Sequence, residues 1–96
     1  MRPTYKKLTN DEINERLKEI DSWHIENGQL NKIFKFESFI EAFGFITKIA
    51  IESEKLNHHP ELYNVYNKVR ISLSTHDVDG LTENDFILAK KIDQLL

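Results

Sequence analysis

Apolar and polar residues alternate on both sides of an Asn-Gly pair in the first third of the chain. Asn27-Gly28 is a strong signal for a two-residue hairpin turn, because both residues tolerate positive φ. This turn would pair Ile25 with Leu30, and it leaves Lys32 as a break in an otherwise apolar face. The sequence therefore predicts a hairpin whose strands cover residues 23–26 and 30–36, with Trp23 opposite Lys32.

A second alternation lies between residues 69 and 75, where apolar residues occupy every other position as in a half-buried strand. Together with residues 62–66 it predicts a second hairpin around Asn67-Lys68. That turn would set Leu62 opposite Leu73 and Pro60 opposite Thr75. Continued by one step, it would set His59 opposite His76.

Three segments have helical spacing and begin with capping-box patterns. Thr9 to Glu12 opens a helix of about residues 10–20, and Ser38 to Glu41 opens one that reaches about residue 57, before Pro60. Thr82 to Asp85 opens the last helix. The apolar stripe of this last helix comprises Phe86, Ala89, Ile92 and Leu96.

The helix at about residues 39–56 is apolar over more of its circumference than one sheet contact requires. Burial within the monomer and burial against another subunit both explain this width. A chain of 96 residues has few elements with which to cover a second face. We therefore expect a homo-oligomer, a dimer or tetramer, formed through this helix.

The predicted order of elements is αββαββα, with no linker and no repeat. It indicates an α+β fold in which a four-stranded antiparallel sheet has its helices packed on one face. The length of 96 residues suits a single domain, residues 1–96.

Composition narrows the classes of function. The net charge is -3 and no long basic run occurs, so direct nucleic-acid binding is not expected. The absence of cysteine excludes disulfide frameworks, thiolate zinc sites and cysteine nucleophiles. No secretory leader or membrane span is visible, and we expect a cytoplasmic protein with no membrane partner.

Three of the four histidines lie between positions 58 and 76. The second hairpin would bring His58, His59 and His76 together beside the end of the long helix. Because imidazole titrates near neutral pH, such a group can give and take protons. Satisfied surface histidines and a three-imidazole zinc site are the competing interpretations, although no HExxH spacing supports chelation.

Carboxylates near the predicted site could orient these imidazoles. Glu54 and Asp85 are the supporting candidates, and Asp85 is also a capping-box residue. Ser74 has no Gly-x-Ser-x-Gly turn around it, which gives nucleophilic catalysis little support.

Several segments together resemble the pterin-4a-carbinolamine dehydratase family. The similar region runs from about Trp23 to the C-terminus. Its motifs are Glu54-Lys55-Leu56-Asn57-His58-His59-Pro60-Glu61, Asn64-Val65-Tyr66-Asn67-Lys68-Val69, Leu73-Ser74-Thr75-His76, Gly80-Leu81-Thr82 and Asp85.

The resemblance implies a hydro-lyase that converts 4a-hydroxytetrahydropterin to quinonoid dihydropterin and water. This reaction recycles the pterin cofactor of aromatic amino acid hydroxylases, and it uses no metal and no separate cofactor. The implied fold is a four-stranded antiparallel sheet with helices on one side. Dimers or tetramers of the family often pack through the long helix, and a small pterin is the partner expected.

The family's functional residues fall on positions of this chain. Its catalytic histidines correspond to His58, His59 and His76. Its pterin contacts correspond to His58, His59, Pro60, Thr75, His76, Asp77 and Val78. We expect His58 and His76 to transfer protons and His59 to bind or orient the pterin.

Two positions depart from the family pattern: Leu62 replaces a common Trp that would help to wall the pterin, and Asp77 replaces a frequent Glu. Two other functions stay open. Some animal members stabilise the dimer of a homeodomain transcription factor through the long-helix surface, so a protein-binding scaffold is one alternative. A metal-dependent hydrolase built on the same histidines is the other.

Overall fold

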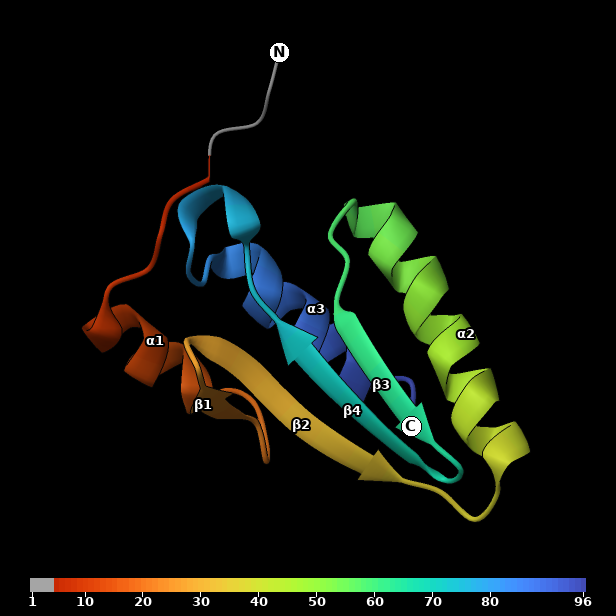
Figure 1. The fold of residues 1–96 in the computed structure, drawn as a ribbon. Coiled ribbons are helices and arrows are strands. Elements are labelled where there is room, and N and C mark those ends of the chain that lie inside the picture. Colours follow the sequence, from red (N-terminus) through yellow and green to blue (C-terminus); the bar gives the residue numbers. More distant parts are fainter. Residues whose placement is uncertain (1–4) are drawn as a thin grey trace.

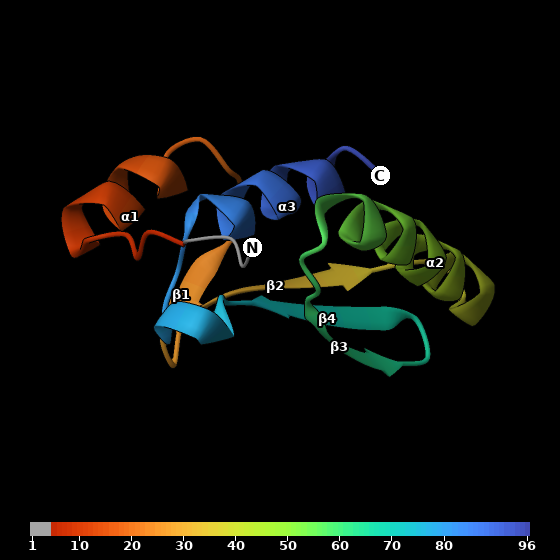
Figure 2. The same ribbon diagram turned by 90° about the horizontal axis from the view of Figure 1, so that it is seen from above.

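The computed structural model describes residues 5–96 and contains one four-stranded antiparallel sheet with three α-helices. The strands lie in the order β1-β2-β4-β3, and all three helices cover the same face (Figures 1 and 2). This confirms the αββαββα order and the one-sided sheet. The elements are α1 (Asn10–Leu17), β1 (His24–Glu26), β2 (Gln29–Lys35), α2 (Phe39–Leu56), β3 (Glu61–Val65), β4 (Lys68–Leu73), the 3-10 turn η1 (His76–Val78) and α3 (Glu83–Asp93).

The core lies between the sheet and the helices. Alternate residues of β4 point into it, as the alternation in the sequence predicted, and Val69, Ile71 and Leu73 are fully buried. The buried apolar residues of the covering elements are Leu30 and Phe34 of β2, Ala42, Phe45 and Ile49 of α2, and Phe86, Leu88, Ala89 and Ile92 of α3. Leu96, which was expected in this stripe, is 72% exposed because α3 ends at Asp93.

Lys32 breaks the apolar face of β2 without leaving an unpaired buried charge. Its Nζ lies 2.8 Å from Asp93 Oδ1 and also donates to the Asp21 carbonyl. The second Asp93 oxygen accepts from the Trp23 indole at 3.0 Å. Asp93 therefore links the first hairpin to the end of α3, and this explains why a lysine is tolerated on the core side.

The first hairpin and the helix starts agree with the sequence in most details. Ile25 pairs with Leu30 across Asn27 and Gly28, which both have positive φ. Thr9 forms the expected capping box of α1, although α1 ends at Leu17, earlier than predicted. At α2 the box is half formed. Ser38 accepts from the Glu41 N–H, but Glu41 accepts from the backbone of Glu37.

The predicted turn of the second hairpin was wrong by one residue. Val65 pairs with Lys68, so the turn is Tyr66-Asn67 and not Asn67-Lys68. Asn67 is held by the end of β2, where it exchanges hydrogen bonds with Phe36. The Asn64 side chain spans the turn by donating to the Tyr66 and Lys68 carbonyls. These tethers favour the observed register.

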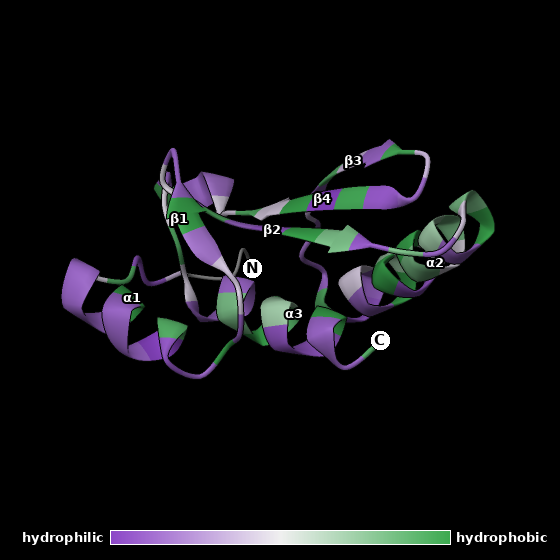
Figure 3. Ribbon diagram, turned by 90° about the horizontal axis from the view of Figure 1, so that it is seen from below, coloured by the Kyte–Doolittle hydropathy of each residue, from purple (hydrophilic) through white to green (hydrophobic). Residues whose placement is uncertain are grey.

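Part of the wide apolar circumference of α2 faces away from the core. Phe39, Ile40, Phe43 and Ile51 are each about half exposed or more. The colouring in Figure 3 shows apolar residues on several sides of this helix. No helix within residues 5–96 is long and apolar enough to cross a bilayer.

Candidate acid/base site

The segment His58-His59-Pro60 is the short connection between α2 and β3. Asn57 ends the helix in the left-handed conformation with φ of 52°, and the His58 N–H then donates to the Ser53 carbonyl at 3.0 Å. Asparagine tolerates this conformation better than most residues. The cap directs the two histidines differently: His58 is buried and His59 is exposed.

His58 belongs to a buried polar cluster centred on Asp85, the fourth residue of the Thr82 capping pattern. His58 Nε2 lies 2.5 Å from Asp85 Oδ1. Asp85 Oδ2 accepts from the Thr75 hydroxyl and from the Thr82 N–H, both at 2.9 Å. The two threonine hydroxyls are 2.8 Å apart. Asp85 thus caps α3 with one oxygen and orients an imidazole with the other.

His59 has a carboxylate partner of its own, but at the surface. Its Nε2 lies 2.5 Å from Glu54 Oε2, on the last turn of α2. The two side chains are 55% and 77% exposed. This pair can separate without leaving a buried charge, so the His59 ring is accessible to a ligand.

His76 opens the η1 turn, which follows β4. The bridge between Thr75 and Gly80 closes this loop and holds residues 76–79 at the end of the sheet where β2 begins (Figure 1). His76 is exposed and lines a cavity of about 210 Å³. The other lining residues are Asn27, Gly28, Gln29, Ser74, Thr75, Asp79 and Gly80.

The observed register corrects the predicted pairing of His59 with His76. Glu61 faces Ser72, and the same register continued past Glu61 would set His59 beside Ser74 and His58 beside Thr75. The shared bonds of His58 and Thr75 to Asp85 agree with this placement. Among residues 5–96, no hydrogen bond joins one of the three histidines to another.

The other predicted contact residues lie around these groups. Pro60 and Val78 are half-buried, and Asp77 is exposed within η1. Sequence reasoning missed Gln29, Asn27 and Gly28 beside His76. The β2–β4 register, which sets Leu30 opposite Leu73, would have found them, but no local pattern predicts which strands pair between hairpins.

The arrangement is suited to proton transfer. The imidazole of His58 is fixed by a buried carboxylate, and the exposed imidazole of His76 lines a surface cavity. A carboxylate bonded to one ring nitrogen fixes the tautomer and the orientation of the imidazole. Within residues 5–96, no three His, Cys, Asp or Glu side chains are grouped as metal ligands.

Comparison with known proteins identifies relatives over nearly the whole chain. The model of the family described as pterin 4 alpha carbinolamine dehydratase matches residues 6–95. A Prochlorococcus marinus (strain NATL2A) protein, provisionally named a pterin-4-alpha-carbinolamine dehydratase, is 57% identical over 75 residues, which are 78% of this chain and 79% of its own. A Rhizobium meliloti (strain 1021) protein of the same provisional name is 53% identical and covers 98% of this chain, with 90% of its own length.

Solved structures agree with the fold. A Brucella melitensis protein described as a transcriptional coactivator/pterin dehydratase superposes with a TM-score of 0.91 at 40% identity, covering 94% of this chain and 98% of its own. A pterin dehydratase-like protein, identified as a RuBisCO assembly factor in the alpha-carboxysome, shares the fold at a TM-score of 0.63 and 24% identity, over 76% of this chain and 84% of its own. From the family match and these identities, the chain belongs to the pterin-4a-carbinolamine dehydratase family.

Proposed function

We propose that the protein is a hydro-lyase that dehydrates 4a-hydroxytetrahydropterin to quinonoid dihydropterin. The observation that carries this proposal is the bond between His58 and the buried Asp85, in a chain of this family. The reaction would return the pterin cofactor of aromatic amino acid hydroxylases to its reducible form.

The chemistry requires two proton transfers. The bond between C4a and its hydroxyl oxygen breaks, and the hydroxyl takes up a proton and leaves as water. A ring N–H gives up its proton, and its electron pair forms the new double bond. One protonated and one neutral imidazole supply both steps, and each is worth about 10²–10⁴-fold in rate.

The surroundings of each histidine support a division of roles. Asp85 accepts from His58 Nε2, which fixes the tautomer and leaves Nδ1 for a substrate proton. His76 lines the cavity and serves as the second proton-transfer group. His59 binds and orients the pterin, with Glu54 as its support. The remaining pterin contacts are Pro60, Thr75, Asp77 and Val78.

The proposal is tested with freshly generated 4a-hydroxytetrahydropterin, by measuring its loss above the uncatalysed rate. His58→Ala and His76→Ala should each lower turnover at least about tenfold, because each removes one proton-transfer group. His24→Ala is the control, since His24 is exposed like His76 but lies on β1 outside the site. Wild-type turnover in both site variants would contradict the proposal.

The exposed apolar residues of α2 support a further role for that helix. We propose that the protein forms a dimer or tetramer through residues 39–56, because Phe39, Ile40, Phe43 and Ile51 present an apolar surface to solvent. A scaffold that stabilises a transcription factor dimer through the same surface is the alternative function.

Sedimentation equilibrium tests the role of α2. The wild type should sediment as a dimer or tetramer, and Phe43→Lys should shift it to the monomer by placing a charge in the interface. Ile33→Lys is the control, because Ile33 is 63% exposed but lies on β2, away from α2. A monomeric wild type would contradict self-association, and an added transcription factor would then be the partner to test.

A further inference from the structure

His76 differs from the other two histidines of the site in how its ring is held. His58 and His59 each have a carboxylate oxygen 2.5 Å from Nε2, whereas no hydrogen bond reaches the His76 ring in the part of the chain that the structure describes. The position of this ring therefore depends on the backbone of the η1 loop. Whatever holds the loop also sets where the His76 imidazole stands.

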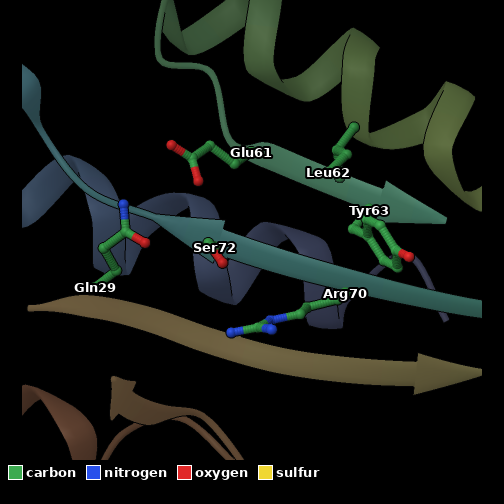
Figure 4. A pocket seen from close by; sticks show the side chains of 6 residues that line it. All are labelled: Gln29, Glu61, Leu62, Tyr63, Arg70 and Ser72. Carbon is green, nitrogen blue, oxygen red and sulfur yellow. The ribbon is translucent and has the colours of Figure 1, made fainter. Parts of the chain in front are cut away.

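The η1 loop borders open space on one side. A cavity of about 210 Å³ lies between the loop and the Asn27-Gly28 turn, since residues of both line it. Gln29, at the edge of this cavity, also lines a hollow of about 420 Å³ on the face of the sheet opposite the helices (Figure 4). Neither space supports the loop, so its conformation must be held at its base and from its other side.

The two sides of the loop base are anchored unequally. On one side, the Thr75 hydroxyl donates to the buried Asp85 at 2.9 Å. On the other side, Gly80 exchanges backbone bonds with Thr75: its carbonyl accepts at 2.8 Å, and its N–H donates at 3.4 Å. Because glycine has no side chain that could reach the core, this side of the base needs a contact from another segment.

The segment before α1 supplies that contact. Residues 5–8 lie beside the η1 loop (Figure 1). The Leu8 N–H donates to the Leu81 carbonyl at 2.8 Å, and Leu8 is buried, which fixes the segment next to Gly80. The side-chain stem of Lys7 crosses the Gly80 backbone, so that a Cβ added at Gly80 would lie 2.6 Å from Lys7 Cε and 3.3 Å from Cδ and Cγ.

This close approach accounts for a glycine at position 80. The φ angle of Gly80 lies outside the left-handed region, so the backbone conformation does not require glycine. A side chain at this position would instead displace the stem of Lys7. The contact involves only the methylene groups of Lys7, and within residues 5–96 its ammonium group forms no ion pair. The stem of Lys7, and not its charge, therefore supports the loop.

We propose that Lys7 is a positioning residue for His76: its stem packs on Gly80 and holds the η1 loop in the conformation that sets the imidazole at the cavity. The inference rests on the proposed dehydratase function, in which His76 transfers a proton. A misplacement of about 1 Å can lower a rate about 10²-fold. Loss of the Lys7 stem loosens the loop but leaves the imidazole in place to react, so a smaller loss is expected.

The test measures kcat for 4a-hydroxytetrahydropterin in two variants of Lys7. Lys7→Ala removes the stem, whereas Lys7→Met keeps atoms at the γ, δ and ε positions and removes the charge. Lys6→Ala is the control, because Lys6 is the neighbouring exposed lysine but bonds Glu12 of α1. Circular dichroism and urea unfolding confirm that each variant is folded at the assay temperature.

We expect only the loss of the stem to slow the reaction. Lys7→Ala should lower kcat about 3- to 10-fold, because His76 is then held less precisely. Lys7→Met and Lys6→Ala should keep the wild-type kcat. Hydrogen exchange of the Thr75 amide, which closes the loop, should be faster in Lys7→Ala than in the wild type and in Lys7→Met.

Double variants test whether Lys7 acts through the loop and through His76. Gly80→Ala should displace the stem and lower kcat as Lys7→Ala does. The double variant Lys7→Ala/Gly80→Ala should lower it no further, because both changes remove the same contact. Lys7→Ala added to His76→Ala should likewise cause no further loss.

The remaining outcomes contradict the proposal. A wild-type kcat or an unchanged Thr75 exchange rate in Lys7→Ala, an equal loss of kcat in Lys7→Met, or a further loss in the His76→Ala background would overturn the positioning role. In those cases turnover by the wild type would leave the dehydratase proposal standing. No turnover by the wild type would overturn both.

Discussion

His58 and His59 are neighbours in the chain, and each has a carboxylate oxygen 2.5 Å from its Nε2. Their surroundings differ greatly. The side chains of His58 and Asp85 are 8% and 0% exposed, whereas those of His59 and Glu54 are 55% and 77% exposed. Because the contact distance is the same in both pairs, we attribute the difference in their expected contributions to stability to burial.

The buried pair is tied to the fold. Asp85 accepts from three donors, and loss of its carboxylate would leave all three without this partner. An unpaired buried group is costly, whereas an exposed ion pair contributes only about 0–1 kcal/mol. We infer that the buried bond to Asp85 holds the His58 ring in one position, whereas the His59 ring is free to move toward a ligand.

The largest expected effect is therefore the loss of the buried carboxylate. Asp85→Asn keeps only one acceptor oxygen for the three donors, and it should lower the free energy of unfolding by about 3–5 kcal/mol. Glu54→Gln, the matched change in the exposed pair, should stay within about 0.5 kcal/mol of the wild type. Urea unfolding measures both. Equal losses in the two variants would show that burial does not separate the pairs.

A smaller effect is expected from the periphery of the buried cluster. Thr75→Val keeps the shape of the side chain but removes the hydroxyl bonded to Asp85 and Thr82, and should cost about 1–3 kcal/mol. Thr47→Val on α2 is the control, because the Thr47 hydroxyl bonds an exposed helix carbonyl at 3.0 Å. If both valine variants unfold at the same urea concentration, the Thr75 hydroxyl contributes nothing to the cluster.

Local patterns predicted much of this structure, but not the contrast between the two histidines. The Asn27-Gly28 turn and the Thr9 cap depend on residues close in sequence, and both were confirmed. The turn at Tyr66-Asn67 was misplaced because Asn67 is bonded to Phe36, which is 31 residues away. Long-range bonds of this kind leave no periodicity in the sequence.

In the candidate site too, contacts between residues close in sequence were predicted, whereas contacts between distant residues were not. The capping pattern identified Asp85 as the residue that would bond the Thr82 backbone, and it does so. That its other oxygen meets His58 depends on how α3 packs beneath the end of α2, and the sequence does not encode that packing locally. The exposure of His59 follows from the same packing and from the left-handed Asn57.

The smallest effect concerns a third carboxylate, that of Glu12, whose side chain is 29% exposed and is bonded to backbone. The Thr9 N–H donates to Glu12 Oε1 at 3.0 Å and, with Lys6, holds the pKa of Glu12 below its ordinary value of 4.5. A carboxylate with a lowered folded-state pKa stabilises the fold above the unfolded pKa, and this stabilisation is lost as the pH falls through the folded pKa. Glu12→Gln should therefore be less stable than the wild type at neutral pH, and the difference should shrink as the pH falls below 4.5. Urea unfolding of both proteins across this range checks the sign, and a difference that grows toward acid would show that the Thr9 bond does not depend on the charge of Glu12.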